Sequence, residues 1–351
     1  MTPPEVILDR FVRTRLRNEP GFSGYVGKLD IESVEPPSFR SFLQLIQKTM
    51  NETLRLESVN ASGGVQHPPF HFDYLEVGAG IKNALAFQHA DFSFIVVTLP
   101  LVECVWHASR RLSRSPTVVE VLHLDPATVA PDVFQGLLFG IQLSFLVSHE
   151  YTHHVHRHCV ENQSGVIGLW TEFLHDGTSG SLNSQAEELD ADGYAAYLVL
   201  AHLLRGDMRS SALAELGRSD LQGTDGDELL LTCFFLAVLA FFCEFWHGEI
   251  DMASVYRFRH PPPPVRITYM IRVAEMWCGQ NACVPQSWFD PTRFQELFRA
   301  AAEVIEENAR KTWDAQMSFL RGTDGVRYDQ QLLERFGAVR RNRGRISTAT
   351  G

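Results

Sequence analysis

Apolar residues recur at helical spacing along most of this chain, and only short runs have the character of strands. Pro131 and Asp132 are typical of a helix start, and apolar residues follow them every three or four positions. One long helix is therefore predicted to continue through the stretch SHEYTHH at Ser148–His154. The same spacing predicts further helices at Phe39–Leu56, Gln185–Leu204, Asp227–Trp246, Val265–Met276 and Pro291–Trp313.

Two stretches have the composition of strands. Asp91–Val102 reads DFSFIVVTLPLV, and its first part is rich in the β-branched and aromatic residues that strands favour. Val118–Leu124 predicts a second, shorter strand. A small sheet among many helices makes α+β, mainly helical, the expected fold class.

Loop signals divide the chain into parts. Three turn-forming stretches punctuate it: Ser62–Gly64, Thr178–Ser181 and Pro261–Pro264. We expect an N-terminal region of unassigned role at 1–80, a central domain at 81–280, a C-terminal helical region at 281–338 and a disordered tail at 339–351.

The most apolar run of the chain is Leu229–Cys243, which reads LLLTCFFLAVLAFFC. Its 15 residues fall short of the roughly 20 that a membrane-spanning helix needs. A buried core helix is the favoured interpretation, and a membrane anchor remains the alternative.

Composition and charge limit which partners the protein can bind and in which compartment we expect it. A net charge of −11 and a pI near 5.7 argue against a nucleic-acid-binding surface. Charged residues interrupt the N-terminus wherever a signal peptide would be apolar, so no export is expected. The cysteines form no C-x-x-C pair and favour reduced thiols in a cytoplasm; they are Cys104, Cys159, Cys233, Cys243, Cys278 and Cys283.

The stretch HEYTH carries the most specific chemistry. His149 and His153 are four residues apart, which places both imidazoles on one face of a helix within reach of one metal ion. Glu150 follows the first histidine, in the position where a carboxylate takes a proton from the catalytic water. The chain's 14 histidines would produce roughly 0.07 such motifs by chance, so accident is a poor explanation.

A catalytic zinc ion needs a third protein ligand, and the segment NSQAEELDADGYAAY supplies candidates. Glu188 and Asp192 stand one helical turn apart. Glu188 can therefore bind the metal while Asp192 accepts the free N–H of a ligand histidine. The alternative is that the acids of this segment are the solvated first turns of a helix; they are Glu187, Glu188, Asp190 and Asp192.

These residues resemble a known family. HEYTH followed by ELDAD is similar to the gluzincin metallopeptidases of the CAAX prenyl protease and HtpX type, in which H-E-x-x-H precedes E-x-x-x-D on a later helix. The segment Asn83–Phe87, reading NALAF, and the element HPPPPVRI at His260–Ile267 also resemble family elements, in the same order. The resemblance covers Asn83 to Ile267 and implies a zincin-like fold with a small sheet beside the motif helix.

The resemblance implies a function and its residues. It implies a zinc endopeptidase acting on a protein or peptide, with one zinc ion held by His149, His153 and Glu188 and with Glu150 as general base. His260 or Arg266 would steady the oxyanion. The substrate would lie extended at the edge of the strand Phe92–Thr98; the residues expected to border it are Asn83, Ala84, Phe94 and Val96.

Other interpretations stay open. The motif also occurs in compact phage-exclusion peptidases of the Lit type, and the chain lacks room between His153 and Glu188 for the spanning helices of HtpX-like proteins. A non-catalytic regulatory protein and a membrane-anchored protease are the alternative functions. His67 and His71 are expected to be structural residues of a proline-broken loop, with contact to a substrate as the alternative. His154, His156 and His158 crowd the end of the motif helix, where solvated residues or partners of the helix dipole are favoured over a second metal site.

Overall fold

The chain forms two compact units. The computed structural model describes residues 2–19, 21–60, 68–78, 80–158, 170–171, 180–206, 208–244, 250–252, 254–304 and 307–348. The first unit contains Met1–Cys104 and Glu150–Gly177, and the second contains Val105–His149 and Thr178–Gly351. This division does not coincide with the boundaries predicted at residues 80 and 280.

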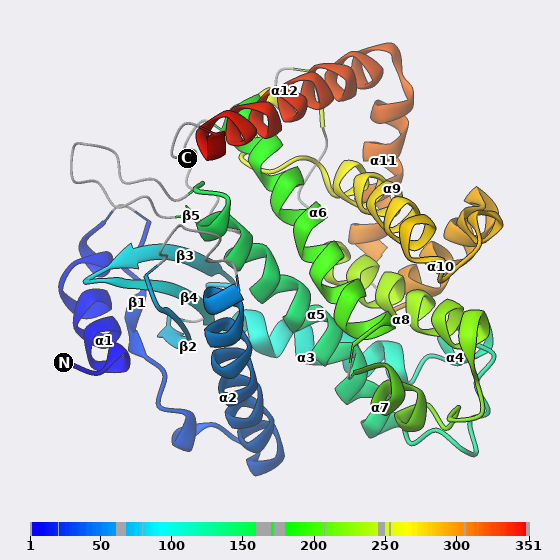
Figure 1. Cartoon of the computed structure of the whole chain (residues 1–351), viewed down its shortest axis with the longest axis horizontal. Coiled ribbons are helices and arrows are strands. Elements are labelled where there is room, and N and C mark those ends of the chain that lie inside the picture. Colours follow the sequence, from blue (N-terminus) through cyan, green and yellow to red (C-terminus); the bar gives the residue numbers. More distant parts are fainter. Residues whose placement is uncertain are drawn as a thin grey trace. The chain divides into compact units, whose positions relative to one another are not determined.

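The first unit is built around a mixed sheet, whose strands β1 to β4 are drawn in blue to cyan in Figure 1. Its strands lie in the order β1-β2-β4-β3-β5, and β2 and β4 are the parallel pair. The bounds are Tyr25–Lys28 for β1, Phe70–Val77 for β2, Ala84–His89 for β3, Phe92–Thr98 for β4 and Trp170–Thr171 for β5. The strand predicted in the first part of Asp91–Val102 is therefore confirmed as β4, in the interior of the sheet.

Two helices complete this unit. Helix α1 (Pro4–Thr14) buries its apolar side, including Leu8 and Phe11, against side chains of β2, β3 and β4. Helix α2 (Pro37–Asn60) supplies hydrogen-bond partners to the backbone of β2, because the Asn51 side chain bonds both the N–H and the C=O of Phe72. The helix predicted at Phe39–Leu56 is thereby confirmed.

The second unit is helical (Figure 1). Helices α3 (Leu99–Ser113) and α5 (Pro131–Val155) run through the division between the units. The remaining helices are α4 (Pro116–Val121), α6 (Leu182–Leu204), α7 (Met208–Glu215), α8 (Gly223–Cys243), α9 (Pro263–Asn281), α10 (Pro291–Ala302), α11 (Glu307–Arg321) and α12 (Thr323–Thr348). The expected α+β, mainly helical class is confirmed at this level of detail.

Local chemistry explains where the site-bearing helices begin. Ser181 and Ser184 form a capping box at the start of α6, in which each side chain bonds the other's backbone N–H. Pro263 and Pro264 open α9, where their missing N–H groups cost no helical hydrogen bond. The helices predicted at Gln185–Leu204 and Val265–Met276 are confirmed, each somewhat longer than predicted.

Several predicted elements are wrong. Val118–Leu124 lies largely in helix α4 instead of a strand, because Ser115 caps the helix and Pro116 opens it. Pro291–Trp313 is divided between α10 and α11. Helix α12 is bounded by Thr323 and Thr348, and the disorder predicted for the segment 339–351 stays a prediction.

Within the described part of the chain, two helices, α5 and α8, are long and apolar enough to cross a membrane. The most apolar window of α8 is 94% buried within the structure, and that of α5 is 61% buried. Core helices of globular proteins pass the same test, so this is weak evidence for a membrane. The burial predicted for Leu229–Cys243 is confirmed.

Candidate metal centre

Helix α5 carries the HEYTH motif in its last two turns. The imidazoles of His149 and His153 lie one turn apart on this continuous helix, and both are buried. Glu150, which lies between the two histidines in the sequence, is also fully buried. Burial of two histidines and a glutamate is costly unless they are paired or bind an ion, so their partners decide what the motif does.

The partners of His149 come from helix α6. The Nε2 atom of His149 lies 3.2 Å from Oε2 of Glu188, and its Nδ1 atom lies 3.0 Å from Oδ1 of Asp192. Both carboxylates are fully buried, which contradicts the alternative that they belong to a solvated acidic turn. Glu187, by contrast, is partly exposed and accepts a hydrogen bond from Asn183.

The ligand atoms of His149, His153 and Glu188 lie within 4.8 Å of one another and can hold a metal ion. Two imidazoles and one carboxylate are a donor set that zinc accepts, and three protein ligands leave a position for water or substrate. The structure thus brings together the three ligands that the sequence predicted.

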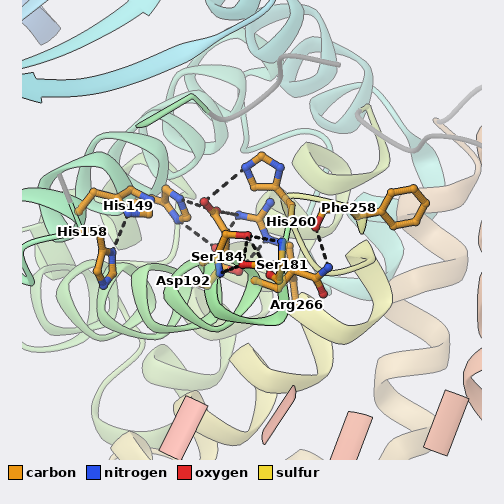
Figure 2. Close-up of polar contacts among 11 residues, drawn as sticks. His149, His158, Ser181, Ser184, Asp192, Phe258, His260 and Arg266 are labelled. Carbon is orange, nitrogen blue, oxygen red and sulfur yellow. Dashed lines mark hydrogen bonds and ion pairs between the residues drawn. The ribbon is translucent and has the colours of Figure 1, made fainter. Parts of the chain in front are cut away.

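Asp192 links the imidazole of His149 to a buried arginine. Figure 2 shows Asp192 joined to both neighbours; Arg266 donates from Nε and Nη2 to the two carboxylate oxygens at 2.8 Å each. Burial alone would raise the pKa of Asp192, but the charge and hydrogen bonds of Arg266, with the bond from His149, bring this pKa below its ordinary value. Asp192 is therefore ionised and accepts a hydrogen bond from Nδ1–H of His149, which leaves Nε2 of this imidazole with a lone pair.

Arg266 was predicted to stabilise the oxyanion of the substrate, and its side chain is instead engaged with other protein groups. Its guanidinium is buried, engaged in a two-pronged pair with Asp192, and stacked over the ring of Phe242 at 4.6 Å. This geometry makes Arg266 a partner of Asp192 rather than a group that is available to a reacting carbonyl. The prediction that Arg266 steadies the oxyanion is therefore corrected.

His260 is placed more favourably for contact with a substrate. Its Nε2 atom lies 3.4 Å from Oε1 of Glu188, and its side chain keeps 19% of its surface exposed. His260 stands in the segment before α9, close to the site in space although it follows Glu188 by many residues (Figure 2). Of the two residues predicted to face the oxyanion, His260 is the one whose position allows it.

His158 is a residue that the sequence interpretation missed. Its Nδ1 atom lies 2.7 Å from Nδ1 of His153, so one ring donates a hydrogen bond to the other (Figure 2). Helix α5 ends in a Schellman turn: Arg157 adopts a left-handed φ of 58°, and the His158 N–H bonds the His153 carbonyl. The chain therefore turns back, and His158 contacts the side chain five residues before it. The sequence predicted His158 to be solvated or at the helix end, and the contact with His153 was not expected.

Two other histidines also differ from expectation. His154 is buried rather than solvated, and its Nε2 atom lies 2.9 Å from the carbonyl oxygen of Phe94. This contact joins the end of α5 to strand β4, so the small sheet lies beside the motif helix within the first unit. His71 lies in strand β2 rather than a loop, 3.3 Å from Asp73, and His67 lies outside the described residues.

The residues predicted to border a substrate are core residues of the first unit. Phe94 and Val96 pack against α1, and the Asn83 amide donates to the Tyr25 hydroxyl. Strand β4 pairs with β2 on one side and β3 on the other, so it has no free edge for an added peptide. The predicted contacts of substrate with Asn83, Ala84, Phe94 and Val96 along β4 are therefore corrected; of these, Ala84 begins the neighbouring strand β3 and is buried.

Comparison of the chain with protein-family models, with curated proteins and with solved structures found no match in any of the three. The gluzincin resemblance thus remains a hypothesis that rests on the motifs and on the geometry described above.

Proposed function

We propose that this protein is a zinc-dependent endopeptidase of gluzincin type. The observation that carries the proposal is the position of Glu188. Glu188 is fully buried, lies 3.2 Å from the imidazole of His149, and is the acid of its segment whose oxygen joins the ligand atoms of His149 and His153 within 4.8 Å. A helix that merely needed acids in its first turns would expose them.

The residues present suit a hydrolytic site. Zinc, when bound by His149, His153 and Glu188, would supply Lewis-acid chemistry that polarises a carbonyl and acidifies water. Glu150 neighbours the first ligand and would accept a proton from the attacking water and then pass it to the leaving amine. His260 would donate a hydrogen bond to the oxyanion that develops on the scissile carbonyl.

The substrate class in this proposal is a protein or peptide, and the location is the cytoplasm. The proposed location rests on the cysteine spacing, which lacks a C-x-x-C pair and favours reduced thiols. A membrane-anchored form of the same enzyme remains the alternative, through α5 or α8. A non-catalytic metal-binding protein is the alternative from another class.

Replacement of Glu150 by glutamine separates an enzyme from a binding protein. Glutamine keeps the shape of the side chain and removes its basicity, so we expect unchanged zinc content and a loss of cleavage of about 10²- to 10⁴-fold. The measurement compares protein termini across the proteome of cells that express the parent or Glu150→Gln, with zinc content determined in both.

The matched control is Glu187→Gln, an identical change at a partly exposed position on α6. It should leave both zinc content and cleavage as in the parent. New termini that depend on Glu150 support a peptidase. Identical termini in parent and Glu150→Gln cells, with full zinc in both proteins, would instead establish a non-catalytic metal-binding protein.

A further inference from the structure

A buried glutamine on the metal-binding helix bonds three groups outside that helix. The Gln185 side chain is fully buried, and its Nε2 atom donates to the carbonyl oxygens of Val255 at 2.8 Å and Phe258 at 2.7 Å. Its Oε1 atom accepts a hydrogen bond from the Tyr328 hydroxyl at 2.5 Å. Both donor hydrogens of the amide and its acceptor are thus in use.

The positions of these groups connect the metal site to distant parts of the second unit. Gln185 precedes the ligand Glu188 by three residues on α6, and Phe258 precedes His260 by two. Figure 2 labels Phe258, whose carbonyl accepts the bond from Gln185, and His260, which follows it in the same segment. Tyr328 belongs to α12, so the C-terminal helix is joined to both segments through one amide.

A second observation shows how closely the His260 segment approaches α6. The N–H of Gly180 donates to the carbonyl of Arg257 at 2.9 Å, just before α6 begins. A Cβ atom at Gly180 would lie 2.0 Å from the carbonyl oxygen of Phe258, so only glycine fits there. The segment that leads to His260 is therefore held against the start of α6 from two sides.

Stability alone does not require a buried amide at position 185. An apolar side chain there could also hold α6 and α12 together, because the replacement of a buried polar network by packed apolar groups often leaves the free energy of unfolding unchanged or raises it. A satisfied network instead specifies one arrangement of the groups it joins. We infer that Gln185 and Tyr328 are positioning residues, which fix the backbone at 255–258 so that His260 stands at the metal-binding helix. The catalytic part of this inference rests on the proposed peptidase function.

The positioning part is tested by hydrogen exchange on the full-length protein. Gln185→Leu removes all three bonds, and Tyr328→Phe removes only the bond from the hydroxyl. We expect the amides of Val255 and Arg257 to exchange at least about tenfold faster in Gln185→Leu and by a smaller factor in Tyr328→Phe. The control is Gln331→Ala, which removes an exposed hydrogen bond between α12 and Tyr256 and should leave both rates within about twofold.

Unchanged exchange in a folded Gln185→Leu protein overturns the inference. If Gln185→Leu does not fold, Tyr328→Phe decides, and unchanged exchange in that variant overturns it equally. This arm needs no substrate, so it gives its answer even if the protein cleaves nothing and the proposed function fails.

The catalytic part is tested by a double-mutant cycle with His260→Ala. Gln185→Leu should lower kcat about 10- to 100-fold with zinc retained, and it should lower kcat little further in a His260→Ala background. Additive losses would show that Gln185 supports the fold without acting through His260, and they would overturn the catalytic part alone.

Discussion

At the scale of single residues, both nitrogens of the His149 imidazole have assigned partners. Nδ1 faces Asp192, which Arg266 keeps ionised, and Nε2 faces Glu188 at the metal position. The tautomer needed for metal binding is thus set by groups that never touch the metal. His153 has a corresponding neighbour in His158 rather than in a carboxylate.

This contact predicts a role for His158 in metal affinity. If Nε2 of His153 binds the metal, its Nδ1 carries the proton and donates to His158, so His158→Ala leaves the ligand ring without its orienting partner. We expect zinc affinity to fall about 10- to 100-fold, measured by competition with a chromophoric chelator. His202→Ala, at an exposed position of α6, is the control and should bind zinc as the parent does. Equal affinity in the His158 and His202 variants would contradict the assigned role.

At the scale of secondary-structure elements, the ion pair between Asp192 and Arg266 joins α6 to α9. Both side chains are buried, and the pair has two hydrogen bonds of 2.8 Å. Helix α6 also supplies Glu188 and Gln185, so one helix carries a ligand, the partner of a ligand and the network at α12. Without Asp192 the buried guanidinium of Arg266 would keep only Glu188 as a counter-charge, with Oε2 at 3.8 Å from Nη2, and such a loss costs far more than the pair itself contributes.

Asp192→Asn should therefore destabilise the fold by about 3 to 5 kcal/mol. The free energy of unfolding is measured in urea on metal-free protein, so that lost metal binding does not contribute. The exposed pair Arg218–Asp220 provides the control, because Asp220→Asn should change stability by no more than about 1 kcal/mol. Similar small losses in both variants would mean that Arg266 finds another partner when Asp192 is neutral.

At the scale of the whole molecule, metal binding and stability are linked. A ligand that binds only the folded state stabilises it by about 2.7 kcal/mol at a free concentration of 100 times Kd. The ligands are drawn from α5 and α6, which are far apart in sequence, so no unfolded chain presents them together.

We expect zinc to raise the unfolding temperature of metal-free protein by an amount that grows with free zinc. Calorimetry across a zinc series would record the shift, and Glu188→Ala should reduce it strongly. Magnesium should have little effect, because it prefers oxygen donors to imidazole. An undiminished zinc shift in Glu188→Ala would show that the metal binds elsewhere.

Local signals in the sequence were sufficient for the elements and ligands that depend on short-range chemistry. The periodic runs predicted α5, α6, α8 and α9, and the four-residue spacings of His149–His153 and Glu188–Asp192 placed the metal-binding group on two helices. Such spacing works because a helix brings residues i and i+4 onto one face whatever surrounds it.

Tertiary structure alone decided the rest. Whether Arg266 faces a substrate or Asp192, whether β4 is an edge or an interior strand, and whether Phe94 and Val96 are open or buried all depend on which elements pack beside them. The sequence did not predict a role for His158 or Gln185. His158 contacts the site because the chain reverses at Arg157. Gln185 bonds Tyr328, which lies on a helix more than a hundred residues away. Spacing determines which side chains share a helix face, whereas the partners of that face come from long-range packing that no local pattern encodes.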